Sequence, residues 1–333
     1  MSFPTTTALS LPIIDISPFL SHTSSESAKN ETAQALYAAC HEVGFFYLTG
    51  HGIPEKTQQA VLDAAREFFL NASEEEKAMI TRKEIGEGGD GARGWQKLGE
   101  NVTGGFNAID LYRPTTTVHT PPYAPITGPN LYPTHPTNFR SLYESYVSLL
   151  HPLGLALMRA MAQALSSPDP LLFTRHTDSS FWVLRAIGYP PLPPGTTGAS
   201  CGAHTDYGCT TFLLADDTKG ALQVRANDGE WINADPVQGA YVVNVGDMME
   251  RWTNGLWKST MHRVVHRGGT YRVSVPFFFE PNWDARVKPL QICVDRTGGV
   301  AKYEETMYGN HLLSKVAGNF YKGNGSEIPL TGA

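Results

Sequence analysis

The sequence predicts a mixed α and β fold, in which helices of the N-terminal half brace a sandwich or barrel of short strands. Two observations lead to this prediction. Apolar residues recur at helical spacing over residues 27–42, after Pro54 and over residues 138–166. Residues 181–280 instead hold short apolar runs separated by glycine, asparagine, aspartate or proline. Many short strands at such spacing are typical of sandwiches and barrels, and jelly rolls are one natural form.

The N-terminal third of the chain alternates short strands with helices. The apolar run at residues 12–16 predicts a strand, and the helix at 27–42 follows it. The aromatic run at residues 44–50 is bounded by glycines and predicts a buried strand. The helix after Pro54 carries an apolar stripe. We therefore expect two strand–helix pairs at the start of the fold.

The middle of the chain is less regular. Residues 86–105 are rich in glycine, and residues 113–136 are rich in proline and threonine, which predicts loops. The helix at 138–166 contains Pro152 and Gly154, so we expect a kink or a break there.

The strands of the C-terminal half complete the predicted fold. No linker separates the two halves, so we expect one domain over residues 1–333 with an N-terminal region at 10–120. The strands fall within a core at residues 180–285 and include residues 183–189, 210–215, 221–224, 239–244, 262–265 and 272–279.

Composition excludes several classes of protein. The net charge of −6 argues against a nucleic-acid-binding protein. No apolar run approaches the ~18 residues of a membrane helix, and the N-terminus lacks the basic region of a secretory signal. Four scattered cysteines without a C-x-x-C pair argue against disulfides and a zinc–thiolate site, so we expect a cytoplasmic protein.

One candidate metal site combines His204, Asp206 and His262. In a strand, residues i and i+2 point to one face, so His204 and Asp206 would converge. Two histidines and one carboxylate form the ligand set of non-haem Fe(II) oxygenases. A second H-x-D triplet, His176 to Asp178, lies in a polar segment ahead of the strands, and we interpret it as a loop or helix end.

A candidate carboxylate receptor follows His262 closely. Strand alternation places Arg272 and Ser274 on one face, together with Phe278 and Glu280. A guanidinium beside a hydroxyl offers a carboxylate bidentate, charge-assisted hydrogen bonds.

Together these residues resemble the signature of the 2-oxoglutarate/Fe(II)-dependent oxygenases, in the isopenicillin N synthase-like branch. Residues 12–15 and 44–54 are similar to the N-terminal region of that branch. Arg93-Gly94-Trp95 resembles its Arg-Gly-Tyr segment, and Glu280-Pro281-Asn282 resembles the end of its last core strand. The resemblance covers residues ~10 to ~310.

The resemblance implies a double-stranded β-helix, or jelly-roll, core at residues 180–285, which holds Fe(II) at one open end through His204, Asp206 and His262. It also implies that 2-oxoglutarate chelates the metal and that O2 is consumed. The products are then succinate, CO2 and a metabolite that is hydroxylated, desaturated or rearranged.

The distal carboxylate of 2-oxoglutarate would lie against Arg272 and Ser274, and Tyr189 matches a tyrosine that often adds a hydrogen bond there. Ile187 stands where many plant members have Asn, a departure that bears on Tyr189 and leaves the metal site untouched.

The candidate substrate contacts are Arg185 and Phe278. Arg185 shares a strand face with Tyr189 and would hold an anionic or carbonyl group, unless it forms a structural ion pair. Phe278 would form a stacking wall, unless it is an ordinary core residue. Trp95, Tyr112 and Trp252 are candidates for the mouth of the site. The expected substrate is a small aromatic or carboxylated molecule.

Two alternatives remain open from the sequence. An oxidase of the isopenicillin N synthase type uses the same triad but gives Arg272 to the carboxylate of its substrate, without 2-oxoglutarate. A non-catalytic jelly roll would use the metal for recognition or stability.

Overall fold

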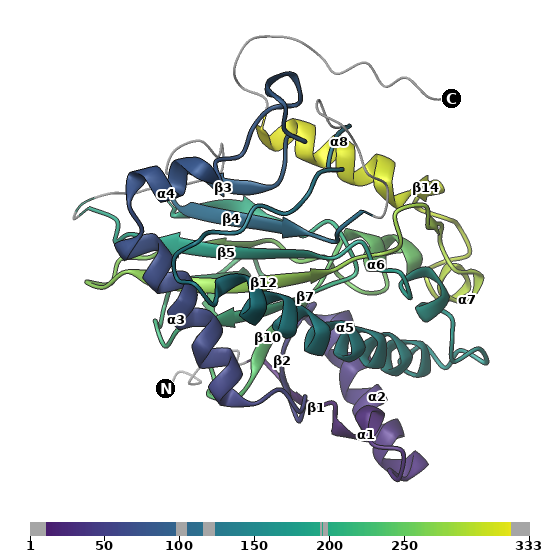
Figure 1. Cartoon of the computed structure of the whole chain (residues 1–333). Helices are drawn as coiled ribbons and strands as arrows, with labels where there is room; N and C mark the ends of the chain where they lie inside the picture. Colours follow the sequence, from purple (N-terminus) through teal and green to yellow (C-terminus); the bar gives the residue numbers. More distant parts are fainter. Residues whose placement is uncertain (1–10, 98–104, 116–123, 194, 196–198, 321–333) are drawn as a thin grey trace.

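The computed structural model describes residues 11–97, 105–115, 124–193, 195 and 199–320. A major and a minor sheet form the centre, and all their strand pairs are antiparallel except one parallel pair at the edge of the major sheet. The long helices pack on one side and the C-terminal helix on another (Figure 1). No helix in the described ranges is long and apolar enough to cross a membrane. The predicted mixed fold with a jelly-roll core is confirmed.

The major sheet joins the N-terminal region to the C-terminal strands. Its second strand pairs with its third in antiparallel register, Tyr241 opposite Leu48, so the two halves share one sheet. The strands lie in the order β1 (Ile13–Asp15), β2 (Phe45–Thr49), β10 (Tyr241–Val245), β7 (Thr210–Ala215), β12 (Arg272–Phe279), β5 (Val183–Tyr189), β4 (Asn107–Tyr112) and β3 (Gly94–Gln96).

The minor sheet closes the sandwich. Its order is β6 (Cys201–His204), β11 (His262–Val264), β8 (Leu222–Arg225) and β9 (Trp231–Asn233). Apolar side chains of both sheets pack into one interior, which includes Tyr47, Val242, Leu222 and Val264. A further two-stranded sheet is made by β13 (Arg286–Val287) and β14 (Thr306–Met307).

The long helices of the N-terminal half cover the outer face of the major sheet. The larger apolar cluster lies between that sheet and the helices, and α5 (Phe139–Ala164) is fully buried at Leu150, Leu157 and Met161. The other helices are α1 (Ser17–Leu20), α2 (Glu26–Glu42), α3 (Glu55–Asn71), α4 (Glu74–Met79), α6 (Asp247–Trp252), α7 (Gln291–Arg296) and α8 (Tyr308–Phe320), with 3-10 turns at Ile85–Glu87 and Thr174–His176.

Helix α5 is continuous through Pro152, so the break considered at that point does not occur. Gly154 has a packing reason instead. A Cβ added at Gly154 would lie 2.4 Å from the ring of Phe279, so only glycine lets α5 approach β12 this closely.

Several elements are absent from the sequence-based prediction. Strand β4 lies just after the glycine-rich segment, which had suggested only loops. Helix α8 and the short helices α6 and α7 were also not predicted. The predicted loop at 113–136 is irregular where described, and its residues 116–123 lie outside the described ranges.

Candidate metal centre and adjoining pocket

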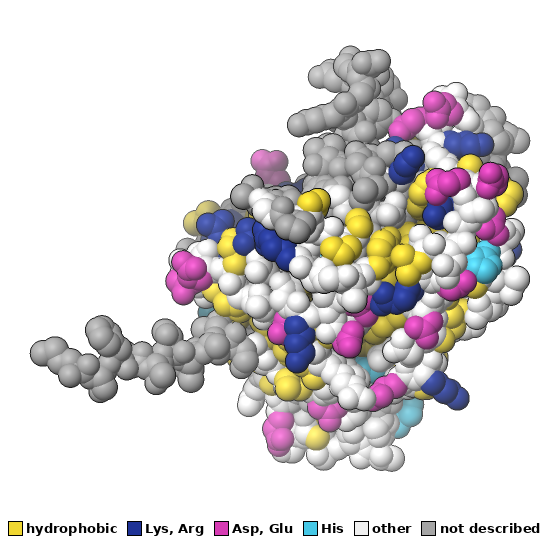
Figure 2. Space-filling model, turned by 90° about the vertical axis from the view of Figure 1, so that its left-hand side faces the viewer, with side chains coloured by type: hydrophobic (Ala, Val, Ile, Leu, Met, Phe, Trp, Pro, Cys, Tyr) yellow, Lys and Arg dark blue, Asp and Glu magenta, His cyan; other side chains and the backbone are white. Residues whose placement is uncertain are grey.

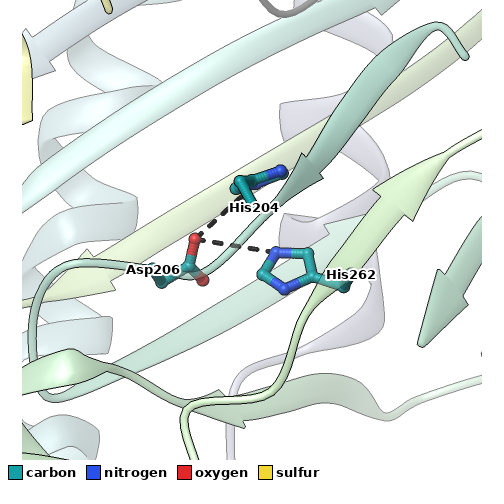
Figure 3. Close-up of side chains that lie close together, drawn as sticks. All are labelled: His204, Asp206 and His262. Carbon is teal, nitrogen blue, oxygen red and sulfur yellow. Dashed lines mark ion pairs between the residues drawn. The ribbon is translucent and has the colours of Figure 1, made fainter. Parts of the chain in front are cut away.

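The candidate metal ligands come together where β6 and β11 pair. His204 ends β6, Asp206 follows in the next turn, and His262 begins β11 directly opposite His204. Oδ1 of Asp206 lies 3.9 Å from Nε2 of His204 and 3.6 Å from Nε2 of His262 (Figure 3). One ligand atom from each residue lies within 4.8 Å of the others. The predicted convergence is therefore present.

Backbone carbonyls orient both imidazoles. Nδ1 of His204 lies 2.8 Å from the carbonyl oxygen of Gly202, and Nδ1 of His262 lies 3.1 Å from that of Thr260. A carbonyl can only accept, so each Nδ1 carries the hydrogen. Nε2 of each ring then faces Asp206, where the neutral imidazole offers its lone pair to a metal.

Two buried side chains hold the other oxygen of Asp206. Asn244 of β10 donates a 2.7 Å hydrogen bond to Oδ2, and the Thr211 hydroxyl donates a second one. Oδ1 thus remains for a cation. The sequence analysis did not identify these two residues, although a polar Asn inside the apolar run of β10 was an available signal.

The donor set fits Fe(II): two neutral imidazoles and one carboxylate on one side of a shared point leave positions for other ligands. Burial lowers the pKa of His262, against the opposing charge of Asp206. Burial also acts to lower the pKa of His204, but Cys201 and Asp206 together raise it to about 9. Metal binding at this site would therefore release a proton from His204.

The second H-x-D triplet lies away from this centre. His176 ends the 3-10 turn at Thr174–His176 and its ring packs on Trp252, 5.8 Å between centroids. Asp178 accepts a 2.8 Å hydrogen bond from Asn282. The described residues include no other metal-binding group beyond the His204 cluster. This triplet begins at the end of a 3-10 turn, in agreement with its interpretation as a loop or helix end.

The predicted carboxylate receptor is also assembled. Arg272 pairs with Tyr189 across β12 and β5, and its Cζ lies 4.9 Å from the centre of the tyrosine ring. Nη1 lies 3.4 Å from Oγ of Ser274. Arg272 is 2% exposed, and its Nε has no hydrogen-bond partner among the described residues. A buried guanidinium with an unmet donor fits an anionic ligand.

A cavity of about 140 Å³ adjoins the metal ligands. Its wall follows one face of three neighbouring strands, because Asp110 pairs with Arg185, and Val183 with both Tyr112 and Phe278. Helix α8 contributes Leu312 and Val316. The full lining is Asp110, Tyr112, Val183, Arg185, Cys201, His204, Thr205, Asp206, Tyr207, Phe278, Glu280, Leu312 and Val316.

Both candidate substrate residues thus face the cavity. Phe278 is half-buried there, and Tyr112 also lines it, whereas Trp95 and Trp252 do not. Arg185 forms the ion pair considered from the sequence: its Nε lies 2.8 Å from Oδ1 of Asp110. Gln96 bridges the pair, because it donates to Asp110 and accepts a 3.1 Å hydrogen bond from Arg185.

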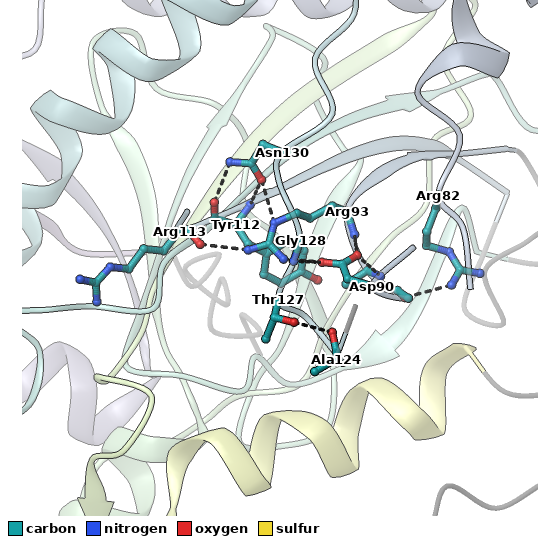
Figure 4. Close-up of polar contacts among 11 residues, drawn as sticks. Arg82, Asp90, Arg93, Tyr112, Arg113, Ala124, Thr127, Gly128 and Asn130 are labelled. Atoms are coloured by element: carbon teal, nitrogen blue, oxygen red, sulfur yellow. Dashed lines mark hydrogen bonds and ion pairs between the residues drawn. The ribbon is translucent and has the colours of Figure 1, made fainter. Parts of the chain in front are cut away.

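Arg93 of the Arg-Gly-Trp segment stabilises the end of β4, the strand that carries Tyr112 in the cavity wall. It pairs with Asp90, and its Nη2 donates a 2.9 Å hydrogen bond to the carbonyl of Arg113 (Figure 4). Asn130 joins the network and bonds the backbone of Tyr112 through both its amide atoms. The buried network therefore fixes the end of β4, from which Tyr112 reaches the cavity.

On the face shown in Figure 2, acidic and basic side chains are interspersed, with no broad patch of one charge.

Two family models match this chain. The model described as the 2OG-Fe(II) oxygenase superfamily matches residues 167–281, which contain the metal cluster, Arg272 and Ser274. The model described as non-haem dioxygenase in morphine synthesis N-terminal matches residues 11–135.

Individual relatives extend over almost the whole chain. Homoarginine-6-hydroxylase 2-ODD-233 of Oryza sativa is 43% identical, covering 93% of this chain and 97% of the relative. The 2-oxoglutarate-Fe(II) type oxidoreductase hxnY of Emericella nidulans is 34% identical over 93% of this chain and 92% of the relative. The crystal structure of Neurospora crassa T7H with alpha-KG and thymine has a TM-score of 0.78 at 26% identity, covering 94% of this chain and 98% of that one.

Proposed function

The chain belongs to the 2OG-Fe(II) oxygenase superfamily, and from that premise we propose that it hydroxylates a basic amino acid of the homoarginine type. It is an Fe(II)- and 2-oxoglutarate-dependent oxygenase that acts on a small molecule. The proposal concerns the substrate and the residues that serve it.

The carrying observation is the set of charged side chains in the cavity beside the metal ligands. Small-molecule cavities are mostly apolar, and the few polar groups in them determine which ligand is bound. In this cavity those groups include Arg185, Asp110 and Glu280, all largely buried. Such groups suit a small molecule that carries both a carboxylate and a cationic group. Of the two substrate classes expected from the sequence, aromatic and carboxylated, we therefore propose the carboxylated one.

Four relatives that are 37–43% identical to this chain carry the name homoarginine-6-hydroxylase, in rice, soybean and Arabidopsis. Homoarginine has a carboxylate at one end and a guanidinium at the other. The cavity offers a cation, Arg185, for the carboxylate and a carboxyl group, Glu280, for the guanidinium, which supports the proposal.

We assign Fe(II) to His204, Asp206 and His262, and the distal carboxylate of 2-oxoglutarate to Arg272 with Ser274 and Tyr189. With Fe(II) and 2-oxoglutarate bound, the centre supplies O2 chemistry: one oxygen atom enters the substrate as a hydroxyl, and the other enters succinate as CO2 leaves. The protein itself orients the ligands and excludes water.

Arg185 keeps donors beyond those used by Asp110 and Gln96, since a guanidinium has five N–H groups. In the proposal these donors receive the substrate carboxylate, while Asp110 holds the guanidinium in place. Phe278 packs against the aliphatic part of the substrate. The reacting carbon then lies next to the metal ligands.

We also propose that residues 1–333 act as one oxygenase domain in the cytoplasm, with residues 10–120 as its N-terminal region and 180–285 as its catalytic core. The shared major sheet supports the single domain. The four cysteines, which are free and buried, suit a reducing compartment.

The test is a turnover assay with Fe(II), 2-oxoglutarate and candidate substrates: homoarginine, arginine, lysine and thymine. The proposal predicts that homoarginine stimulates succinate release and gains one oxygen atom by mass spectrometry. Stimulation by thymine alone would contradict it and favour a pyrimidine substrate instead.

A further inference from the structure

We propose that Glu280 determines the specificity of this enzyme by pairing its buried carboxylate with a cationic group of the substrate, a guanidinium or an ammonium. The inference deepens the proposed function and rests on it, because it assumes that the cavity beside the metal ligands is the substrate site. No sequence motif assigns this role to Glu280.

The carboxylate of Glu280 is buried without an adequate partner. The residue is 4% exposed and lines the cavity together with His204 and Asp206. Its Oε2 has no hydrogen-bond partner among the described residues. A buried acceptor left unsatisfied is costly, and such atoms at a cavity often await a ligand.

The other carboxylates of the cavity are already committed. Oδ2 of Asp206 accepts two hydrogen bonds, and its Oδ1 faces the histidines. Asp110 is paired with Arg185 and accepts from Gln96. No lysine, arginine or histidine in the described ranges forms an ion pair with Glu280. Glu280 is therefore the free carboxylate that an incoming cation would meet.

Burial raises the pKa of Glu280 to about 8, the charges of Asp206 and Asp247 add to the rise, and the neighbouring Tyr308 hydroxyl opposes it. The carboxyl group thus lacks a compensating positive charge. A cation placed beside it would favour its ionised form.

The fold keeps space for this carboxylate beside the metal-binding turn. A Cβ added at Gly208 would lie 1.4 Å from Oε2 of Glu280, so the carboxylate occupies the place of a side chain at 208. Gly208 follows Asp206 by two positions. Glu280 comes two residues after Phe278, which shares the cavity wall. A cation held here would place the neighbouring carbon of the substrate close to the metal ligands.

The experiment compares a charged ligand with a neutral one of nearly the same shape. Homoarginine and homocitrulline differ in having a guanidinium or a urea at the end of the same chain. Each is titrated by calorimetry into the anaerobic Fe(II)–2-oxoglutarate enzyme, as the wild type, Glu280→Gln and Asp110→Asn. Glutamine keeps the shape of glutamate and removes only the charge.

The wild type is expected to bind homoarginine at least about 30-fold more tightly than homocitrulline, the lower end for a buried charge pair. Glu280→Gln should lose most of this preference, because homoarginine binding falls while homocitrulline binding changes little. Asp110→Asn, the matched control, should weaken both ligands alike and keep the preference. An unchanged preference in Glu280→Gln would overturn the proposal.

Two controls separate this inference from the proposed function. The 2-oxoglutarate titration of Glu280→Gln should match that of the wild type, which shows a folded site. If the wild type does not bind homoarginine, the proposed substrate is wrong. The titrations are then repeated with lysine and norleucine, a cationic and a neutral ligand, in place of homoarginine and homocitrulline. A lysine preference that Glu280→Gln loses would still support the role of Glu280. A wild type without preference for either cation would overturn it.

Discussion

Asn244 of β10 donates a 2.7 Å hydrogen bond to Oδ2 of Asp206, which lies in the turn after β6. Because this bond engages Oδ2, Oδ1 of Asp206 points toward His204 and His262. The orientation of the carboxylate therefore depends on a residue that does not itself ligate a metal.

Asn244→Ala is expected to weaken Fe(II) binding by about 10- to 100-fold, since partners of metal ligands typically contribute that much. The affinity is measured by anaerobic Fe(II) titration against a competing chelator. Asn233→Ala, on the exposed edge strand β9, is the control and should bind Fe(II) as the wild type does. Normal affinity in Asn244→Ala would show that the bond does not position Asp206.

Asp206→Ala and His262→Ala should each abolish Fe(II) binding and turnover and leave the fold intact, because the ligands lie at an open end of the sandwich. Circular dichroism and thermal unfolding check the fold. His176→Ala should retain both iron and activity, because His176 packs on Trp252. Loss of iron from His176→Ala would mean that the wrong H-x-D triplet has been assigned.

Gly208→Ala should displace the carboxylate of Glu280, because the new methyl group would lie 1.4 Å from Oε2. We expect the preference for homoarginine over homocitrulline to fall at least about tenfold, roughly 1.4 kcal/mol. The measurement is the same anaerobic titration. Gly86→Ala, where a Cβ would meet nothing within 4 Å, should have no effect. A Gly208→Ala enzyme with normal ligand preference would contradict the placement of Glu280.

Helix α8 should loosen in acid. Although burial acts to raise the pKa of Asp247, the His311 ring 3.7 Å away, the Ser259 hydroxyl and the charge of Lys315 lower it to about 2. The folded pKa lies below the ordinary value of 3.8, so this stabilisation is present above about pH 4 and is lost as the pH falls toward 2. It amounts to about 2 kcal/mol.

The anchor of α8 is the ion pair between Asp247 and Lys315 of that helix, in which Nζ lies 3.1 Å from Oδ2. Urea unfolding between pH 5 and pH 2.5 tests this anchor. The wild type should lose more stability over that range than Asp247→Asn, which has no charge to neutralise. Equal pH dependence in the two proteins would rule out the anchor.

The sequence predicted well what is encoded locally. The strands at 183–189, 210–215 and 272–279 coincide with β5, β7 and β12, because each is a short apolar run between turn residues. The H-x-D spacing of His204 and Asp206 pointed to the cluster, but β6 ends at His204 and Asp206 lies beyond it, so strand alternation is not what brings the two together. His262 joins them because it pairs with His204 across β6 and β11.

What the sequence did not predict depends on contacts between distant segments. Asp110 meets Arg185 only because β4 pairs with β5, and nothing near either residue indicates this pairing. Glu280 was placed on the correct strand face, but its lack of a partner emerges only once the surrounding side chains are packed. Asn244 is conspicuous as a polar residue in an apolar strand, but its partner Asp206 can be identified only once the fold is known.

The most direct test of the account is the binding of 2-oxoglutarate to the anaerobic Fe(II) enzyme, followed by metal-to-ligand charge-transfer absorption, in the wild type and Arg272→Leu. Loss of one partner of a buried charge pair typically costs ~2–5 kcal/mol, or roughly 30-fold to several-thousand-fold in affinity. Arg272→Leu should lose that affinity while retaining Fe(II), and Arg272→Lys should recover only part of it. An unchanged titration in Arg272→Leu would contradict the account and assign Arg272 to the substrate, as in an oxidase.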